Sequence, residues 1–175
     1  MIVLLTGTPG TGKSTVARIL SKKLGYNLIS LNDWIFKEAG EAVVDYDDFR
    51  STNVVDVDIL EGRLRNINDD VIIEGHLSHF LSIGDIVVVL RAHPRVLNER
   101  LTGFSDSKRG ENMEAEALDV CLIESLERHD SSKVFEVDTT EKQPEEVAEA
   151  IQRIMEGRRD GYRPGKIDWS EELRP

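Results

Sequence analysis

A glycine-rich loop near the N-terminus constrains the fold of this chain more than any other feature. Residues 7–14 match the pattern G-x-x-x-x-G-K-[ST] at every fixed position. The apolar run at 2–5 precedes the loop and predicts a buried strand, and residues 15–24 have the spacing of an amphipathic helix. Because strand, glycine loop and helix form the arrangement that cradles phosphate groups, we interpret the segment as a P-loop and not as a chance glycine-rich turn.

The residues of this loop suit a phosphorylated ligand together with a divalent cation. Glycines at positions 7, 10 and 12 let the backbone curl until several N–H groups point at phosphate oxygens. The N-terminus of the following helix adds partial positive charge at the same place. In such loops the lysine, here Lys13, neutralises the β and γ phosphates, and the hydroxyl of Ser14 can bind Mg²⁺.

Apolar runs alternate with helical spacing along the rest of the chain. The predicted strands are residues 2–5, 27–31, 71–74, 85–90 and 134–137. The predicted helices are residues 15–24, 34–37 with Asn32 or Asp33 as the cap, 54–64, 94–101, 111–128 and 144–155. Runs of Val and Ile without alternation are typical of a parallel sheet covered on both faces. We therefore predict an α/β fold with a five-stranded parallel sheet, helices on both faces, and a ligand site beyond the carboxyl ends of the strands.

The composition indicates one globular domain, residues 1–175, with room for a single sizeable core. The N-terminus lacks a basic segment and its apolar run ends at Thr6, so we expect neither a signal peptide nor a membrane span. The single cysteine, Cys121, lies on an apolar helical face, which favours a buried structural thiol over a nucleophile. A chain with one cysteine also fits a reducing cytoplasm, which is the location we expect.

The net charge of −11 restricts the class of partner. Broad binding to nucleic acid backbones needs clustered cations, so we do not expect it here. The acidic balance is compatible with a basic protein partner, but plain solubility explains it better.

A carboxylate and a histidine follow the third predicted strand. Glu74 ends this strand, where a carboxylate can hold Mg²⁺ through water or orient an attacking water. His76 lies two residues later and could reach the same phosphates. Because strand ends form the site in this fold, we predict catalytic roles for Lys13, Glu74 and His76, and a metal role for Ser14 and Glu74. His79 lies in an apolar stretch and is interpreted as a core or surface histidine.

Two further segments are candidates for substrate binding. Residues 33–58 lie between the second and third predicted strands, where small P-loop kinases bind their second substrate. Asp33 and Asp58 flank this polar stretch, and helix capping or a solvated surface explains each acid about as well. Residues 102–110 separate two predicted helices and form either a mobile flap over ATP or an ordinary surface loop.

Three elements together resemble the adenylate kinase isoenzyme-six family, also called CINAP, and in particular its archaeal branch. They are the start Leu4–Ser14, the element Glu74-Gly75-His76, and the segment Glu111–Leu118. The P-loop occurs in many families, whereas its combination with Glu-Asn-x-x-Ala-Glu is more specific, and the resemblance spans nearly the whole chain.

The resemblance implies the fold of a P-loop nucleoside monophosphate (NMP) kinase. The NMP-binding insertion would span about 30–53, the lid about 100–110 and an irregular tail about 157–175. The implied activity is broad-specificity transfer of a phosphoryl group from ATP to AMP or another NMP, with ATP hydrolysis and with Mg²⁺ as cofactor. The implied cellular role is maturation of the small ribosomal subunit and its rRNA, through transient binding of the platform protein of the uS-eleven family. A P-loop kinase of another small metabolite is the alternative, since its P-loop would look the same.

The same resemblance assigns individual residues. The residues that would contact the ATP phosphates are Gly10, Gly12, Lys13, Ser14 and Thr15. The family's Asp-x-His element falls on Glu74 and His76, with glutamate in place of aspartate. The candidate contacts to the acceptor are Asp33, Lys37 and Asp58.

The lid departs from the family's pattern. Where the family has an Arg-Gly-aromatic triplet, this chain has Thr102-Gly103-Phe104. Arg100, Lys108 or Arg109 could replace the missing arginine, and of these we assign Arg100 to ATP. Lys142, in the loop after the last predicted strand, is the candidate beside the adenine.

Overall fold

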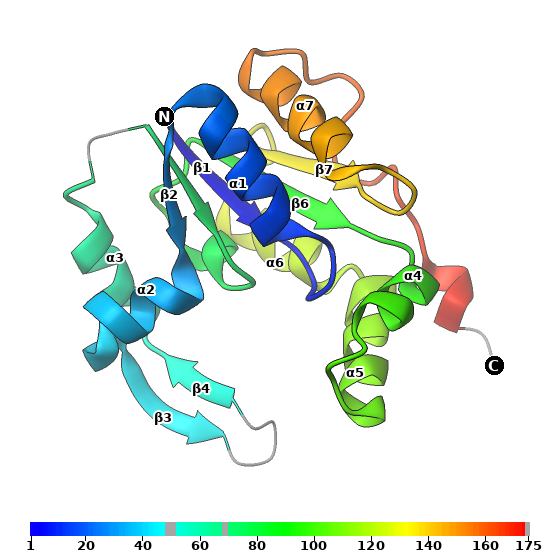
Figure 1. Ribbon diagram of the computed structural model, residues 1–175, viewed down its shortest axis with the longest axis horizontal. Coiled ribbons are helices and arrows are strands. Elements are labelled where there is room, and N and C mark those ends of the chain that lie inside the picture. The colour runs from blue at the N-terminus through cyan, green and yellow to red at the C-terminus, as the bar shows by residue number, and fades with distance from the viewer. Residues whose placement is uncertain (48–51, 68–69, 174–175) are drawn as a thin grey trace.

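A computed structural model describes residues 1–47, 52–67 and 70–173 of the chain. Within them, a five-stranded parallel sheet runs in the order β2-β5-β1-β6-β7 (Figure 1). Its strands are β1 Ile2–Thr6, β2 Asn27–Ser30, β5 Val71–Glu74, β6 Ile86–Arg91 and β7 Val134–Asp138. The five predicted strands and the predicted α/β fold are confirmed.

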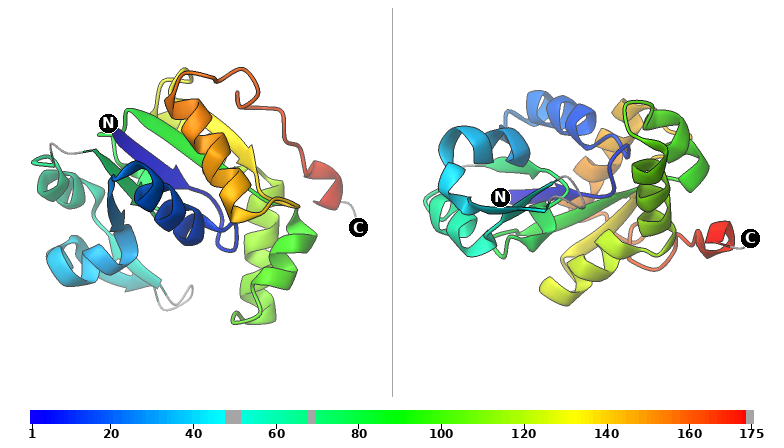
Figure 2. Two further views of the ribbon diagram at one scale, coloured as in Figure 1. Left: turned by 45° about the horizontal axis from the view of Figure 1, so that its top comes forward. Right: turned by 90° about the horizontal axis from the view of Figure 1, so that it is seen from below.

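Helices cover both faces of this sheet, as predicted. The helices are α1 Lys13–Leu24, α2 Leu31–Glu38, α3 Val57–Leu64, α4 Pro94–Arg100, α5 Asp106–Ala117, α6 Val120–Arg128 and α7 Pro144–Met155. Helices α1 and α7 lie side by side on one face, and α6 lies on the opposite face (Figures 1 and 2). Helices α4 and α5 project beyond the carboxyl end of the sheet (Figure 1).

The central strand shows why its sequence is apolar without alternation. Val3 and Leu5 point into the core beneath α1 and α7, whereas Leu4 points into the core on the other face. All three side chains are fully buried. Successive residues of a strand face opposite sides, so a strand covered on both sides needs an apolar residue at every position. Burial of each such side chain contributes roughly 2 kcal/mol to the stability of the fold.

The segment predicted as a polar insertion contains a hairpin that the sequence analysis missed. Strands β3 Val43–Asp47 and β4 Thr52–Val55 pair antiparallel, with an irregularity in register between Val43 and Asp45. This irregularity breaks the period-two alternation that would identify a strand. Asp48, an acidic residue of this polar stretch, lies outside the described residues.

Several predicted helix starts are wrong, and the capping residues of α3 and α2 explain two of them. Helix α3 begins at Val57 rather than Val54, because the Asp56 carboxylate accepts hydrogen bonds from the N–H groups of Asp58 and Ile59 at 2.9 and 3.2 Å.

Helix α2 begins at Leu31, so Asn32 and Asp33 lie in its first turn and do not cap it. Ser30 occupies the capping position, but its hydroxyl donates to Glu74 at 2.6 Å instead.

The long helix predicted at 111–128 is also wrong, because it is two helices. Helix α5 ends at Ala117 and α6 begins at Val120. Between them Asp119 has a φ of 57°, the one positive φ of a residue other than glycine among the described residues. Its carboxylate pairs with Arg91, and this tertiary contact holds a backbone conformation that interrupts the helix.

The loop predicted at 102–110, interpreted as either a flap or an ordinary surface loop, is shorter than expected. Helix α5 already begins at Asp106, with the Ser105 hydroxyl as its cap, so only residues 101–105 form a loop. The tail after α7 is irregular up to a short 3₁₀ helix at Ser170–Leu173. Over the described ranges, no helix is both long and apolar enough to cross a membrane.

Candidate functional site

The carboxyl ends of three neighbouring strands bring the predicted site together. Strand β1 pairs with β5 on one side and with β6 on the other, with Leu5 opposite Glu74 and Thr6 opposite Val89. The loop that follows β1 therefore emerges between the residues that end β5 and β6. This is the edge where open α/β sheets bind their ligands.

The glycines of the loop have conformations and surroundings that other residues could not share. Gly10 and Gly12 have φ values of 89° and 90°, in the left-handed region. Gly7 has a φ of 135°, and a Cβ atom there would lie 2.3 Å from the carbonyl oxygen of Leu90. The loop is thus folded tightly against the end of β6.

The Lys13 ammonium lies over this loop. Its Nζ donates to the carbonyl oxygens of Gly7 and Thr8 at 2.7 and 2.9 Å. Burial lowers the pKa of Lys13 to about 8, against the opposing effect of Cys121, Glu74 and Glu116. The side chain is therefore a cation at neutral pH, held where phosphate oxygens would meet the loop.

Glu74 is 4% exposed and is held by two hydroxyl groups. Ser14 donates to its Oε2 at 3.1 Å, and Ser30 donates to its Oε1 at 2.6 Å. Hydroxyl and carboxylate oxygens are the ligands that Mg²⁺ prefers, and the ion usually keeps several waters and binds few protein groups. Ser14 and Glu74 fit such an ion, and the described part of the chain has no cluster of three metal-binding side chains.

The two histidines of this region differ in their surroundings. His76 is exposed and lies within range of the charges of Lys13 and Glu74. Partial loss of solvent lowers the pKa of His76, the Lys13 ammonium lowers it further, and Glu74 opposes the shift. His79 is buried and bonds Thr6 Oγ1 at 2.7 Å and Glu124 Oε2 at 3.0 Å, so it is a core histidine, as one of our two interpretations had it.

A first cavity of about 310 Å³ lies between the P-loop and the start of α7. Besides P-loop residues, Arg100, Thr139, Lys142 and Gln143 line it. The Arg100 guanidinium donates to the carbonyl oxygens of Gly10 and Thr139 at 3.4 and 3.0 Å. The structure thus brings both predicted basic residues, Arg100 and Lys142, to the cavity that borders the P-loop.

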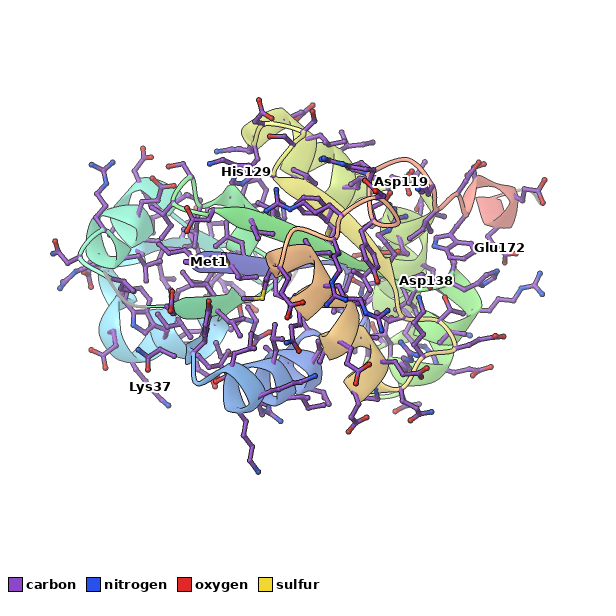
Figure 3. All side chains as sticks on the ribbon, turned by 90° about the horizontal axis from the view of Figure 1, so that it is seen from above. Met1, Lys37, Asp119, His129, Asp138 and Glu172 are labelled. Atoms are coloured by element: carbon purple, nitrogen blue, oxygen red, sulfur yellow. The ribbon has the colours of Figure 1, made fainter. Side chains whose placement is uncertain are left out.

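A second cavity of about 150 Å³ lies between α2, the hairpin and the loop after β5. The residues that line it are Asn32, Ile35, Phe36, Val43, Asn53, Val55, His76 and Leu77. The predicted acceptor residues Asp33, Lys37 and Asp58 are exposed and line neither cavity. Lys37 lies on the outer side of α2 (Figure 3).

The residues that sequence reasoning missed carry no local motif. Ser30 holds Glu74 from a neighbouring strand, and Asn32 immediately precedes the predicted residue Asp33. Phe36 and Asn53 enter the second cavity only because the missed hairpin folds toward α2. A prediction of a hairpin at residues 43–55 would have indicated that Phe36 and Asn53 line a common cavity.

Comparison with known proteins places the chain in a family. Residues 3–119 match the family model described as AAA domain. The protein called "Putative adenylate kinase" in Thermococcus gammatolerans is 47% identical over 175 residues, which cover 98% of this chain and 94% of that protein. A protein of the same name in Archaeoglobus fulgidus is 46% identical over 178 residues, 99% of this chain and 94% of its own length.

A solved structure supports the fold independently. Shikimate kinase from Bacteroides thetaiotaomicron superposes with a TM-score of 0.59, over 89% of this chain and 98% of that chain, at 20% sequence identity. The archaeal relatives carry a general name, so the narrower resemblance to the isoenzyme-six branch stays a prediction. By its P-loop match and its similarity along nearly the whole sequence, the chain belongs to the P-loop family of these archaeal proteins called "Putative adenylate kinase".

Proposed function

We propose that this protein is an ATP-dependent NMP kinase that transfers the γ-phosphoryl group of ATP to AMP or another NMP. The observation that carries the proposal is the pair of cavities on the two sides of the predicted phosphate site. The P-loop borders the first cavity, and His76, two residues after Glu74, borders the second. Two substrates bound there would face each other across Lys13 and Glu74.

The chain's own residues would act mainly by holding charge in place. Phosphoryl transfer asks for little covalent chemistry from the protein, so positioning and electrostatic stabilisation supply most of the rate. Lys13 and the N–H groups of the P-loop would hold the β and γ phosphates. Ser14 and Glu74 would hold Mg²⁺, which when bound neutralises phosphate charge.

We assign His76 a role in an ATPase activity that accompanies the kinase reaction. Partial burial and the Lys13 ammonium lower the pKa of His76 and so favour the neutral ring, in which one nitrogen can accept a hydrogen bond from a water or an acceptor hydroxyl. The ring lines the second cavity, from which an attacking oxygen would come. Without an acceptor, water in the same position would be phosphorylated slowly, which is hydrolysis of ATP.

The lining of the second cavity supports a nucleobase as the group bound there. The amides of Asn32 and Asn53 offer donors and acceptors for the edge of a base, and Phe36 offers an aromatic face. No arginine or lysine occurs among the described residues that line it. A small anionic acceptor such as a hydroxy acid would find no cation there, which argues against the alternative of another metabolite kinase.

The test is a steady-state assay of ADP formation from ATP and Mg²⁺, with each NMP in turn and with shikimate as the metabolite control. We expect AMP or another NMP to raise the rate well above the rate of ATP alone. Acceleration by shikimate and by no NMP would overturn the proposal. The variant Lys13→Ala separates this activity from contaminating kinases.

A second, compatible role is binding of a basic ribosomal protein, as the resemblance implies. Leu118, Ile123 and Leu126 are exposed apolar side chains at the α5–α6 turn and on α6, and the exposed Glu127 lies beside them. Together with the net charge of −11, this surface favours a partner with both basic and apolar groups. Calorimetric titration with the purified platform protein is the test. Absence of binding at low salt, with and without ATP, would leave the kinase activity alone.

A further inference from the structure

A buried ionic cluster lies next to the P-loop and has no part in the proposed chemistry. Arg91, the last residue of β6, is 1% exposed and forms ion pairs of 2.7 Å with Glu116 and Glu136. Its third partner is Asp119, at the turn between α5 and α6. Glu116 and Glu136 are also buried, at 2% and 3% exposure.

Glu116 connects this cluster to the loop. Its Oε2 accepts a hydrogen bond of 2.5 Å from the hydroxyl of Thr8, the second residue of the P-loop. Its Oε1 accepts bonds from Arg91 Nε at 2.7 Å and from the N–H of Ala92 at 3.1 Å. Both carboxylate oxygens are therefore hydrogen-bonded, and the bonds from Arg91 and Ala92 orient the group toward Thr8.

Thr8 passes this constraint on to Lys13. The carbonyl oxygen of Thr8 accepts from Lys13 Nζ at 2.9 Å and from Thr11 Oγ1 at 2.8 Å. Thr8 is 2% exposed, so its hydroxyl has no alternative partner in bulk water. The peptide that supports the catalytic ammonium is thus held from behind by the last turn of α5.

We propose that Glu116 is a positioning residue for the P-loop, held by Arg91 and acting through the Thr8 hydroxyl. The proposal rests on the proposed kinase function for the reaction that is positioned. It gives a physical role to the Glu-Asn-x-x-Ala-Glu segment, whose final glutamate is Glu116. Buried ion pairs contribute little net stability compared with apolar packing, so stability alone does not account for this cluster.

A double-mutant cycle tests the inference. Thr8→Val removes the hydroxyl and keeps the shape of the side chain, and Glu116→Gln removes the charge of the acceptor. We expect each substitution to lower kcat/KM by about 10-fold. The double variant should have about the same kcat/KM as the less active single variant, because both substitutions break the same hydrogen bond between Thr8 and Glu116. Thr8→Ser, which keeps the donor, should restore most of the activity.

The matched control is Glu136→Gln. Glu136 pairs with Arg91 from the opposite side and accepts from the N–H of Gly165 at 2.6 Å, but it does not touch the P-loop. We expect a lower melting temperature with kcat/KM nearly unchanged, and additivity with Thr8→Val. Losses that add for Thr8→Val and Glu116→Gln, or an equal loss in Glu136→Gln, would overturn the inference.

Two further measurements keep the result interpretable. If Glu116→Gln does not fold, the Thr8 variants decide. Wild-type activity in Thr8→Val would overturn the inference, and so would a Thr8→Ser variant no more active than Thr8→Val. The affinity for ADP, measured by calorimetry in every variant, reports on the P-loop without any acceptor. A wild-type protein that binds ADP but phosphorylates no NMP contradicts the proposed function, and the same cycle is then decided by the ADP affinities.

Discussion

The P-loop and the second cavity meet at the loop after β5, yet they are held in place in different ways. The P-loop is fixed by buried contacts to Leu90, Glu116 and the end of β6. The second cavity is walled by α2, whose Ile35 is buried in the core, and by a two-stranded hairpin whose Val44, Tyr46 and Val54 are exposed, as is Phe36 of α2. Regions with few buried contacts open at low free-energy cost, so we expect the nucleotide side to be rigid and the acceptor side to adapt on binding.

Removal of the Lys13 ammonium, on the rigid nucleotide side, should lower turnover more than any other substitution. Lys13→Ala deletes the charge held over the loop, and we expect turnover to fall at least about 100-fold. The control is Lys22→Ala, which removes an exposed lysine from the same helix. Near wild-type turnover of the Lys13 variant, in the assay of ADP formation, would remove the P-loop from the mechanism.

Substitution of His76 tests whether this residue, which lines the second cavity, acts on the attacking group and not on bound ATP. We expect His76→Ala to lower ATP hydrolysis roughly 30-fold while the affinity for ATP stays nearly unchanged, because the ring acts only on the attacking group. Calorimetry and steady-state kinetics on the same preparation separate the two quantities. Equal losses of binding and turnover would mean that His76 has a structural role.

The rigid side should also have its own pH dependence. The pKa of Lys13 is lowered to about 8, so the cation that meets the phosphates is present below this pH and is lost above it. We expect kcat/KM for ATP to approach a tenfold decrease for each pH unit well above about 8. Binding of phosphate raises the pKa again, so kcat at saturating ATP should fall at a higher pH. A kcat/KM that is flat between pH 7 and 10 would contradict this assignment.

The smallest expected effect is on KM for the NMP. It distinguishes binding in the second cavity from binding by the acceptor residues predicted from the sequence. Phe36→Ala should raise KM for the NMP about fivefold by removing an aromatic face, with KM for ATP unchanged. Lys37→Ala is the matched partner, because Lys37 is the next residue on α2 and lines neither cavity. A larger rise in KM for the Lys37 variant would favour the acceptor residues suggested by the sequence over the cavity.

The same contrast explains how far the sequence could be interpreted. The strands and the P-loop were predictable because each depends on a contiguous pattern, an apolar run or spaced glycines. The hairpin was missed because the sequence of β3 is acidic and its register with β4 is irregular. No local pattern predicts that Asn53 and Phe36 line one cavity, since this depends on how the hairpin folds toward α2.

The division between α5 and α6 shows a different limit. Residues 111–128 have continuous helical spacing, and nothing within them predicts a positive φ at Asp119. The break depends on Arg91, which comes from β6 and pairs with both Asp119 and Glu116. The sequence gives no indication that an arginine at the end of an apolar strand is buried. The position of the helix break therefore depends on tertiary contacts and not on local helix propensity.

The central place of β1 in the sheet has a consequence for how the protein folds. Ile2 pairs with Val71, and Val3 pairs with Ile86, so both partners of the strand that leads into the P-loop come from distant parts of the chain. Closing such long loops costs chain entropy before the strands gain contacts, and this slows folding. We expect the loop to acquire its phosphate-binding shape only when the sheet is assembled. ATP present during refolding should then leave the folding rate unchanged and slow unfolding, because a ligand of the native state alone stabilises contacts that form late.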